Sequence, residues 1–258
     1  MKAIRRARGC KGDAALLEGV HLVREALSAG VTLTLTVATP AFLDGPDGRA
    51  LLPRLPRPPL TIESGLLRSL LDSDAPRGIA AIASLPRRRG TLDPLPRTPN
   101  GLYLYADGVQ DPGNVGALLR AAEAAGACGV GLAPGSAHPH HPRALRASAG
   151  SALRLPLAWH VAPTAFADYL APLAPRWWAL APRGGADPAE VDLRDTTVLV
   201  VGAEGPGLSS PARDAVDGAL TIPLMPPVES LNSAIAAAVV LFEAARQRRL
   251  HEVGAAPR

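Results

Sequence analysis

Residues 222–242 of the chain read IPLMPPVESLNSAIAAAVVLF. A strand-like segment at 219–222 runs into a loop that its prolines stiffen, because each proline ring fixes the backbone φ angle. The loop ends in Ser230-Leu231-Asn232-Ser233, and serine and asparagine are residue types that cap helix N-termini. Residues 234–242 are apolar on every side, which predicts a buried helix too short for the about 20 residues of a membrane span. We therefore expect a polar loop held rigidly against a core, where a binding site is expected.

The composition allows one large domain or two smaller ones, since the chain has 258 residues and is 47% hydrophobic. The net charge is +4, and arginines cluster at 5–8, 87–89, 143–154 and 246–249. Each cluster fits either a solvated face or a nucleic-acid surface, and both interpretations stay open. The two cysteines show no metal spacing and no disulfide framework, and the charged N-terminus has no apolar segment after it. We expect a cytoplasmic protein with no membrane segment and no metal.

Hydrophobic periodicity divides the chain into two parts. In residues 1–85 it predicts a small α/β domain with a helix at 18–27, a strand at 31–38, a loop at 44–59, a helix at 66–71 and a strand at 78–83. Residues 86–100 hold four prolines and are expected to be a linker.

From residue 101 onward, strands and helices alternate. We expect buried strands at 102–106, 128–132, 155–159, 177–181, 198–201 and 219–222, with helices at 116–125, 164–171 and 211–216. Such alternation predicts a parallel or mostly parallel sheet covered on both faces, with ligands bound at the carboxyl ends of its strands.

Residues 107–120, DGVQDPGNVGALLR, follow the first of these strands. Asn114 is expected to cap the next helix, and Arg120 falls on its second turn among alanines and leucines. Spacing alone favours a surface ion pair of Arg120 with Glu123, three residues further on.

Residues 198–209, VLVVGAEGPGLS, join a buried strand to a glycine-rich loop with one carboxylate. Glycines let backbone amides approach a ligand closely, although a plain strand-to-helix turn would look the same. The pattern is neither a dinucleotide fingerprint nor a P-loop.

Taken together, the three stretches resemble the signature motifs of the SpoU/TrmH-type (SPOUT) RNA 2′-O-ribose methyltransferases, in order and in spacing. The resemblance covers residues 101–249, and residues 17–20, 77–81 and 143–150 also resemble family segments. Three features depart from the pattern: Pro226-Pro227 where a glycine is common, Ser233 where valine often follows Asn232, and the histidine-rich turn 138–141. We interpret that turn as a solvated loop rather than a metal site.

The resemblance implies an α/β fold in which residues 101–258 form a parallel-sheet domain with a trefoil knot that binds S-adenosyl-L-methionine. It implies a small ribosomal-protein-like α/β domain at 1–85 that binds the RNA substrate, and a homodimer. The residues that it assigns to catalysis are Asn114, Arg120, Glu204, Ser230 and Asn232. The residues that it assigns to the cofactor are Gly202, Glu204, Gly205, Gly207, Ile222, Leu224, Leu231 and Asn232.

The implied reaction is methyl transfer from S-adenosyl-L-methionine to a ribose 2′-hydroxyl of RNA, with 23S ribosomal RNA favoured. Because arginine is effectively always protonated, we expect Arg120 to bind a phosphate and stabilise the forming alkoxide rather than act as a base. The alternatives are a transfer RNA 2′-O-methyltransferase, a resistance-type ribosomal RNA enzyme, and a catalytically silent RNA-binding assembly protein. A Rossmann-type methyltransferase is disfavoured because the glycine loop comes so late in the chain.

Overall fold

The computed structural model describes residues 2–10, 13–71, 77–85 and 89–255. Internal contacts divide the chain into two units, one made of residues 1–87 with 138–154 and the other of residues 88–137 with 155–258. The sequence predicted a division into 1–85, 86–100 and 101–258, so the structure differs in giving residues 138–154 to the first unit. Each unit is described by itself below.

The first unit is built on a four-stranded sheet in the order β1-β4-β2-β3. The strands are β1 (Ala14–Glu18), β2 (Thr32–Ala38), β3 (Leu60–Thr61) and β4 (Ile79–Ser84). β4 pairs antiparallel with β1 and β2, and β3 pairs parallel with β2. The strands predicted at 31–38 and 78–83 are confirmed, whereas β1 had no distinct signal because it is a short apolar run next to a helix.

The first unit also contains several helices. They are α1 (Lys2–Arg8), α2 (Val20–Ser28), α3 (Pro40–Asp44), α4 (Pro46–Leu51), η1 (Leu52–Arg54), α5 (Ser64–Leu70), α7 (Pro142–Ser148) and α8 (Ser151–Arg154). α1 and α5 bury Ile4, Ala7, Leu67 and Leu70 in one core with the sheet. The loop predicted at 44–59 is confirmed at 55–59 and was wrong before that, because Pro46 stands at the first helical position and starts α4.

Residues 138–154 are held in the first unit by charged side chains. Arg146 Nη1 donates to Glu18 Oε2 at 2.7 Å, and only 2% of the Glu18 side chain is exposed. Arg154 forms a second ion pair with Glu25. The expected solvated loop at 138–141 was wrong in one respect, because His140 is 6% exposed and its Nε2 lies 3.2 Å from the carbonyl oxygen of Ala152. Part of the arginine cluster at 143–154 is therefore used for folding rather than for solvation.

The second unit contains a six-stranded, fully parallel sheet in the order β10-β8-β9-β5-β6-β7. The strands are β5 (Leu102–Asp107), β6 (Gly129–Leu132), β7 (Leu157–Trp159), β8 (Arg176–Leu180), β9 (Thr197–Gly202) and β10 (Gly218–Leu220). The ends of each strand differ by at most two residues from those predicted. The predicted α/β fold with a parallel sheet is therefore confirmed.

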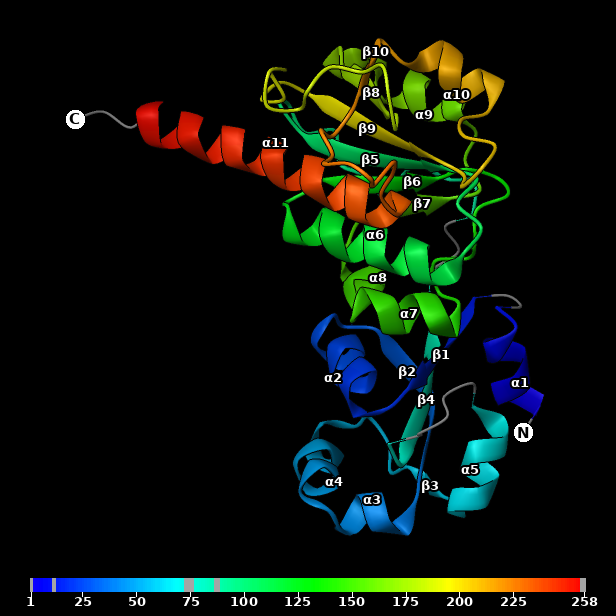
Figure 1. Ribbon diagram of the computed structural model, residues 1–258. Helices are drawn as coiled ribbons and strands as arrows, with labels where there is room; N and C mark the ends of the chain where they lie inside the picture. The colour runs from blue at the N-terminus through cyan, green and yellow to red at the C-terminus, as the bar shows by residue number, and fades with distance from the viewer. Residues whose placement is uncertain (1, 11–12, 72–76, 86–88, 256–258) are drawn as a thin grey trace. The chain divides into compact units, whose positions relative to one another are not determined.

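Helices lie on both faces of the parallel sheet (Figure 1). α6 (Pro112–Ala124) and α11 (Ser233–Ala255) cover one face, and α9 (Pro163–Leu170) and α10 (Ser210–Ala215) cover the other, with η2 (Ala171–Leu173) after α9. Under α9 the core contains Tyr105, Phe166 and Trp177, and the Phe166 and Trp177 rings meet edge to face at 5.9 Å. This packing fixes the central strands whose carboxyl ends carry the site.

The described part of the predicted linker packs onto the second unit. Leu95 is 2% exposed in its core, and the Tyr103 hydroxyl donates to the carbonyl of Pro96 at 2.7 Å. Gly90 N donates to the carbonyl of Trp159 at 2.8 Å. Residues 86–88, including two arginines of the predicted basic cluster, lie outside the described residues.

α11 is longer and more exposed than the sequence predicted. Residues 234–242 were expected to be buried all round, but Ile235, Val239 and Phe242 are 56%, 45% and 45% exposed. The helix packs against α6 and β9 through one face only, which includes Ala237 and Leu241, so the opposite apolar stripe stays open. Among the described helices, none combines the length and the hydropathy needed to cross a membrane.

Candidate active site

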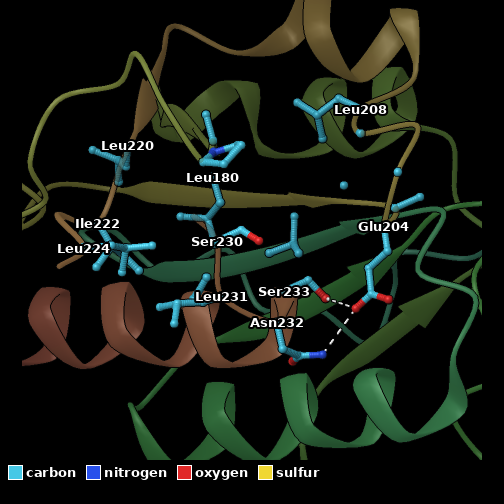
Figure 2. Close-up of a pocket in the computed structure, with 18 residues that line it drawn as sticks. Leu180, Glu204, Leu208, Leu220, Ile222, Leu224, Ser230, Leu231, Asn232 and Ser233 are labelled. Atoms are coloured by element: carbon cyan, nitrogen blue, oxygen red, sulfur yellow. Dashed lines mark hydrogen bonds between the residues drawn. The ribbon is translucent and has the colours of Figure 1, made fainter. Parts of the chain in front are cut away.

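A cavity of 620 Å³ opens at the carboxyl ends of β8, β9 and β10 (Figure 2). Its walls come from the residues just after these strands and from the loop that leads into α11. The volume is in the range of about 300–1,000 Å³ found for pockets that take small ligands and cofactors. The position agrees with the rule that ligands bind at the carboxyl edge of a parallel sheet.

All eight residues that the resemblance assigned to the cofactor line this cavity: Gly202, Glu204, Gly205, Gly207, Ile222, Leu224, Leu231 and Asn232. They come from two segments, one after β9 and one after β10, which the sheet order separates by β8. Apolar side chains of Leu180 and Leu220 line the same cavity. The cavity therefore combines an apolar wall with backbone groups and one carboxylate.

The glycine-rich loop after β9 is a tight hairpin. Ala203 N donates to the Gly207 carbonyl at 3.1 Å, and Gly207 N donates to the Ala203 carbonyl at 3.0 Å. Gly205 and Gly207 have φ values of +89° and +74°, in the region that favours glycine. A Cβ atom on Gly202 would lie 2.6 Å from the backbone carbon of Gly207, so the strand end and the returning arm of the loop are in direct contact.

Three side chains from the three sequence motifs meet beside the cavity. Glu204 Oε1 accepts a hydrogen bond from Asn114 Nδ2 at 2.8 Å and another from Asn232 Nδ2 at 3.2 Å. Asn232 Nδ2 also lies 3.1 Å from Asn114 Oδ1. Figure 2 shows Ser233 and Asn232 pointing toward Glu204, with Ser233 Oγ at 3.5 Å. The cluster holds one carboxylate and two amides at the mouth of the cavity, a set that can orient a polar substrate.

The backbone explains how two asparagines reach Glu204. The N-cap of α6 is Asp111, whose Oδ1 accepts from Asn114 N at 2.9 Å, so the prediction that Asn114 caps this helix was wrong. Asn114 lies in the first turn instead, and its side chain is used for Glu204. The prediction of a cap before α11 is confirmed, because Asn232 Oδ1 accepts from the backbone N of Ala234 at 3.0 Å.

The two other predicted catalytic residues stand apart from this cluster. Ser230 lines the cavity from the loop after β10. Arg120 is exposed on α6, and in the described part of the chain it forms no hydrogen bond or ion pair. The pairing with Glu123 that spacing favoured is therefore not formed, and the Arg120 guanidinium is available to a ligand.

Sequence reasoning missed Asp107, which ends β5. This residue is 5% exposed, and its Oδ2 accepts from Ser209 N at 2.6 Å. Burial raises the pKa of the neighbouring Tyr105 phenol well above its usual value, and the Asp107 carboxylate raises it further. A signal was present, since a carboxylate at the carboxyl end of a predicted central strand is where sites form.

Metal ligands do not gather at this site. Within the residues that the structure describes, no three His, Cys, Asp or Glu side chains come close enough together to hold a metal ion.

Comparison with known proteins agrees with this geometry. Residues 101–242 match the SpoU rRNA Methylase family, and the match includes all six strands of the parallel sheet and all three motifs. The chain belongs to this family. Within it, the chain is 30% identical over 242 residues to the 23S rRNA (guanosine(2553)-2′-O)-methyltransferase RlmP of Bacillus subtilis, covering 90% of this chain and 88% of that one.

Two other members of the SpoU family extend the comparison. The 23S rRNA (guanosine-2′-O-)-methyltransferase RlmB of Xanthomonas campestris is 42% identical over 150 residues, which is 57% of this chain and 59% of that one. The crystal structure of the SpoU methyltransferase AviRb of Streptomyces viridochromogenes, in complex with the cofactor AdoMet, superposes with a TM-score of 0.86 at 26% identity. That superposition covers 96% of this chain and 97% of AviRb, so the likeness includes the first unit as well.

Proposed function

We propose that this SpoU-family protein transfers a methyl group from S-adenosyl-L-methionine to a ribose 2′-hydroxyl of 23S ribosomal RNA. The observation that carries the proposal is the cluster of Asn114, Glu204 and Asn232 at the mouth of the 620 Å³ cavity. The names of RlmP and RlmB, which are 23S rRNA 2′-O-methyltransferases, support the reaction and the class of RNA.

The cavity beside the glycine-rich loop is the proposed cofactor site. Its residues fit S-adenosyl-L-methionine because an apolar wall suits the adenine and methylene groups, while the glycines expose backbone donors and acceptors. The cofactor supplies an electrophilic methyl group on a sulfonium. The chain's own part is to hold the 2′-hydroxyl in line with that methyl group and to help it lose a proton.

Arg120 is proposed to bind the phosphate next to the target ribose and to stabilise the forming alkoxide. Its guanidinium is exposed and has no protein partner among the described residues, so it is free to take an anionic ligand. A base role is excluded on chemical grounds, because arginine stays protonated in proteins. Asn114, Glu204, Ser230 and Asn232 orient the ribose and the loop.

The first unit is proposed to be a ribosomal-protein-like domain that binds the RNA substrate, within the expected boundary of residues 1–85. Its α1 exposes Lys2, Arg5 and Arg6 while burying Ile4 and Ala7, which supports a phosphate-binding role.

We further propose that the C-terminal chain of the 101–258 domain forms a trefoil knot and that the protein works in the cytoplasm. The knot is the fold that the family resemblance implies for this domain.

A homodimer is proposed through α11. Ile235, Val239 and Phe242 lie three and four residues apart, so they form one stripe along the helix, and each is about half exposed. An exposed apolar stripe on a helix is typical of a surface that a protein partner covers. A second copy of the chain covers it in this proposal.

Transfer RNA as substrate and a catalytically silent assembly role are the competing functions. The silent role is disfavoured because all five expected catalytic residues are present and three of them form one hydrogen-bonded cluster. The test is methyl transfer from labelled S-adenosyl-L-methionine to unmodified 23S ribosomal RNA and to unmodified transfer RNA in parallel. The proposal predicts that the ribosomal RNA becomes labelled and that the Glu204→Gln variant gives no label. Label in neither RNA would overturn the proposal. Label in transfer RNA alone would show that the substrate is transfer RNA and not ribosomal RNA.

A further inference from the structure

A buried carboxylate lies beneath the cofactor loop, where none of the three sequence motifs assigns a role. Asp107 is the last residue of β5 and pairs in register with Gly202, the last residue of β9. We propose that Asp107 is a positioning residue that holds the loop 203–208 in the shape that binds the cofactor. This inference rests on the proposed function, because the loop is one wall of the proposed S-adenosyl-L-methionine site.

One end of the loop is held by the carboxylate itself. Asp107 Oδ2 accepts from the backbone N of Ser209 at 2.6 Å, a short bond to a charged acceptor. Such charge-assisted bonds are roughly twice as strong as neutral ones. Ser209 is also the N-cap of α10, where its Oγ accepts from Ala212 N at 3.4 Å. The residue that follows Leu208 is therefore fixed by Asp107 on one side and by a helix on the other.

Hydrogen bonds also hold the turn that follows Asp107 at the end of β5. Gly108 N donates to Ser136 Oγ at 3.1 Å, and Ser136 Oγ donates to the carbonyl of Ala106 at 3.1 Å. A Cβ atom built on Gly108 would lie 3.6 Å from Ala203 Cβ, which is ordinary contact. Ala203, the first residue of the loop, therefore lies close to the turn that follows Asp107.

The loop needs this support because few contacts within the loop hold its tip in place. Residues 204–207 are exposed, and the hairpin is closed by the two backbone bonds between Ala203 and Gly207. Glu204 sits at this tip and must meet Asn114 and Asn232 from other segments. A carboxylate that is 5% exposed is costly to bury without a partner, so its bond to the loop is a strong constraint on the position of Ser209.

The experiment compares Asp107→Asn and Asp107→Ala with a matched control, Asp217→Asn. Asp217 Oδ2 also accepts from a backbone amide, that of Trp177 at 2.7 Å, but at the amino end of β8, away from the cavity; its side chain is 44% exposed. Affinity for S-adenosyl-L-methionine is measured by isothermal titration calorimetry. Methyl-transfer kinetics are measured with either substrate varied.

We expect Asp107→Ala to weaken cofactor binding about 10- to 100-fold, as loss of a charged hydrogen bond does, and Asp107→Asn to weaken it about 3- to 10-fold because an amide oxygen still accepts. KM for the cofactor rises, while kcat at saturating cofactor and KM for RNA change little. Asp217→Asn binds as the wild type does. A merely structural role would lower the thermal stability of the Asp107 variants without this split between KM for the cofactor, kcat and KM for RNA.

Hydrogen–deuterium exchange supplies a second measurement. The amides of residues 203–209 exchange faster in Asp107→Asn, while those of β5 and β9 keep their protection. Wild-type affinity in Asp107→Asn together with unchanged exchange in the loop overturns the inference, whether or not Asp107→Ala folds. A wild-type protein that binds no S-adenosyl-L-methionine overturns the proposed function instead, so the two failures are distinguishable.

Discussion

Replacing Gly202 by alanine tests whether the shape of the cofactor loop controls activity. A Cβ atom at this position would lie 2.6 Å from the backbone carbon of Gly207, 2.8 Å from its oxygen and 2.9 Å from Leu208 N. All three are backbone atoms, so no side chain can rotate away to relieve the overlap. Because ordinary carbon contacts are about 3.5–4.0 Å, the returning arm must move by roughly 1 Å.

The size of the effect follows from that displacement. A misplacement of about 1 Å at a site that orients reacting groups costs on the order of 100-fold in rate. Overpacking of this kind costs about 1–3 kcal/mol in free energy of unfolding, which the fold can tolerate. We therefore expect Gly202→Ala to stay folded, to bind S-adenosyl-L-methionine weakly and to lose about 100-fold in kcat/KM for methyl transfer.

Gly65→Ala is the matched control. Gly65 is in α5 of the first unit, and nothing lies within 4 Å of its built Cβ atom. Alanine there removes freedom from the unfolded chain and is expected to add about 0.4–1 kcal/mol of stability without changing turnover. The reasoning is refuted if folded Gly202→Ala keeps cofactor affinity and kcat/KM close to those of the wild type.

Three further predictions concern other parts of the chain. Arg146→Ala removes the hydrogen bond that an arginine donates to the buried Glu18 carboxylate and should cost about 1.5–3 kcal/mol in urea unfolding. Arg24→Ala breaks an exposed pair of the same 2.7 Å length and should cost about 1 kcal/mol or less, and equal losses would contradict the role of burial. Phe242→Glu places a charge on the exposed stripe of α11 and should shift the mass in light scattering from two chains to one, and an unchanged mass would remove α11 from the interface. Burial raises the pKa of the Cys10 thiol to about 11, so its alkylation by iodoacetamide should be slow at pH 8 and should speed up as the pH rises toward 11, since the thiolate is the nucleophile; fast reaction at pH 8 would show that the thiol ionises normally.

The parallel sheet could be predicted from the sequence because its strands are short apolar runs between turn residues. β9 and β5 are buried along nearly their whole length, and continuous apolar runs of this kind are typical of strands covered on both faces. The first unit was harder, since β1 is a short apolar run that only Gly19 separates from α2. α4 was hidden in a segment rich in proline and glycine.

The parts that could not be predicted depend on contacts between distant residues. No local pattern shows that Arg146 reaches Glu18, 128 positions earlier, and so brings residues 138–154 into the first unit. Asp111 rather than Asn114 is the N-cap of α6, and the Asn114 side chain instead binds Glu204, 90 positions later. Composition indicated that residues 234–242 of α11 are apolar, but only the packing of α6 against one side shows which of them stay exposed.

The position of the methyl group in the product tests the central claim most directly. Unmodified 23S ribosomal RNA is incubated with the protein and S-adenosyl-L-methionine carrying a labelled methyl group, and the RNA is then hydrolysed with alkali. A methyl group on the ribose 2′-oxygen blocks cleavage of the adjoining phosphodiester, so we predict that the label is recovered in an alkali-resistant dinucleotide. Label recovered in single nucleotides, on a base, would contradict the account.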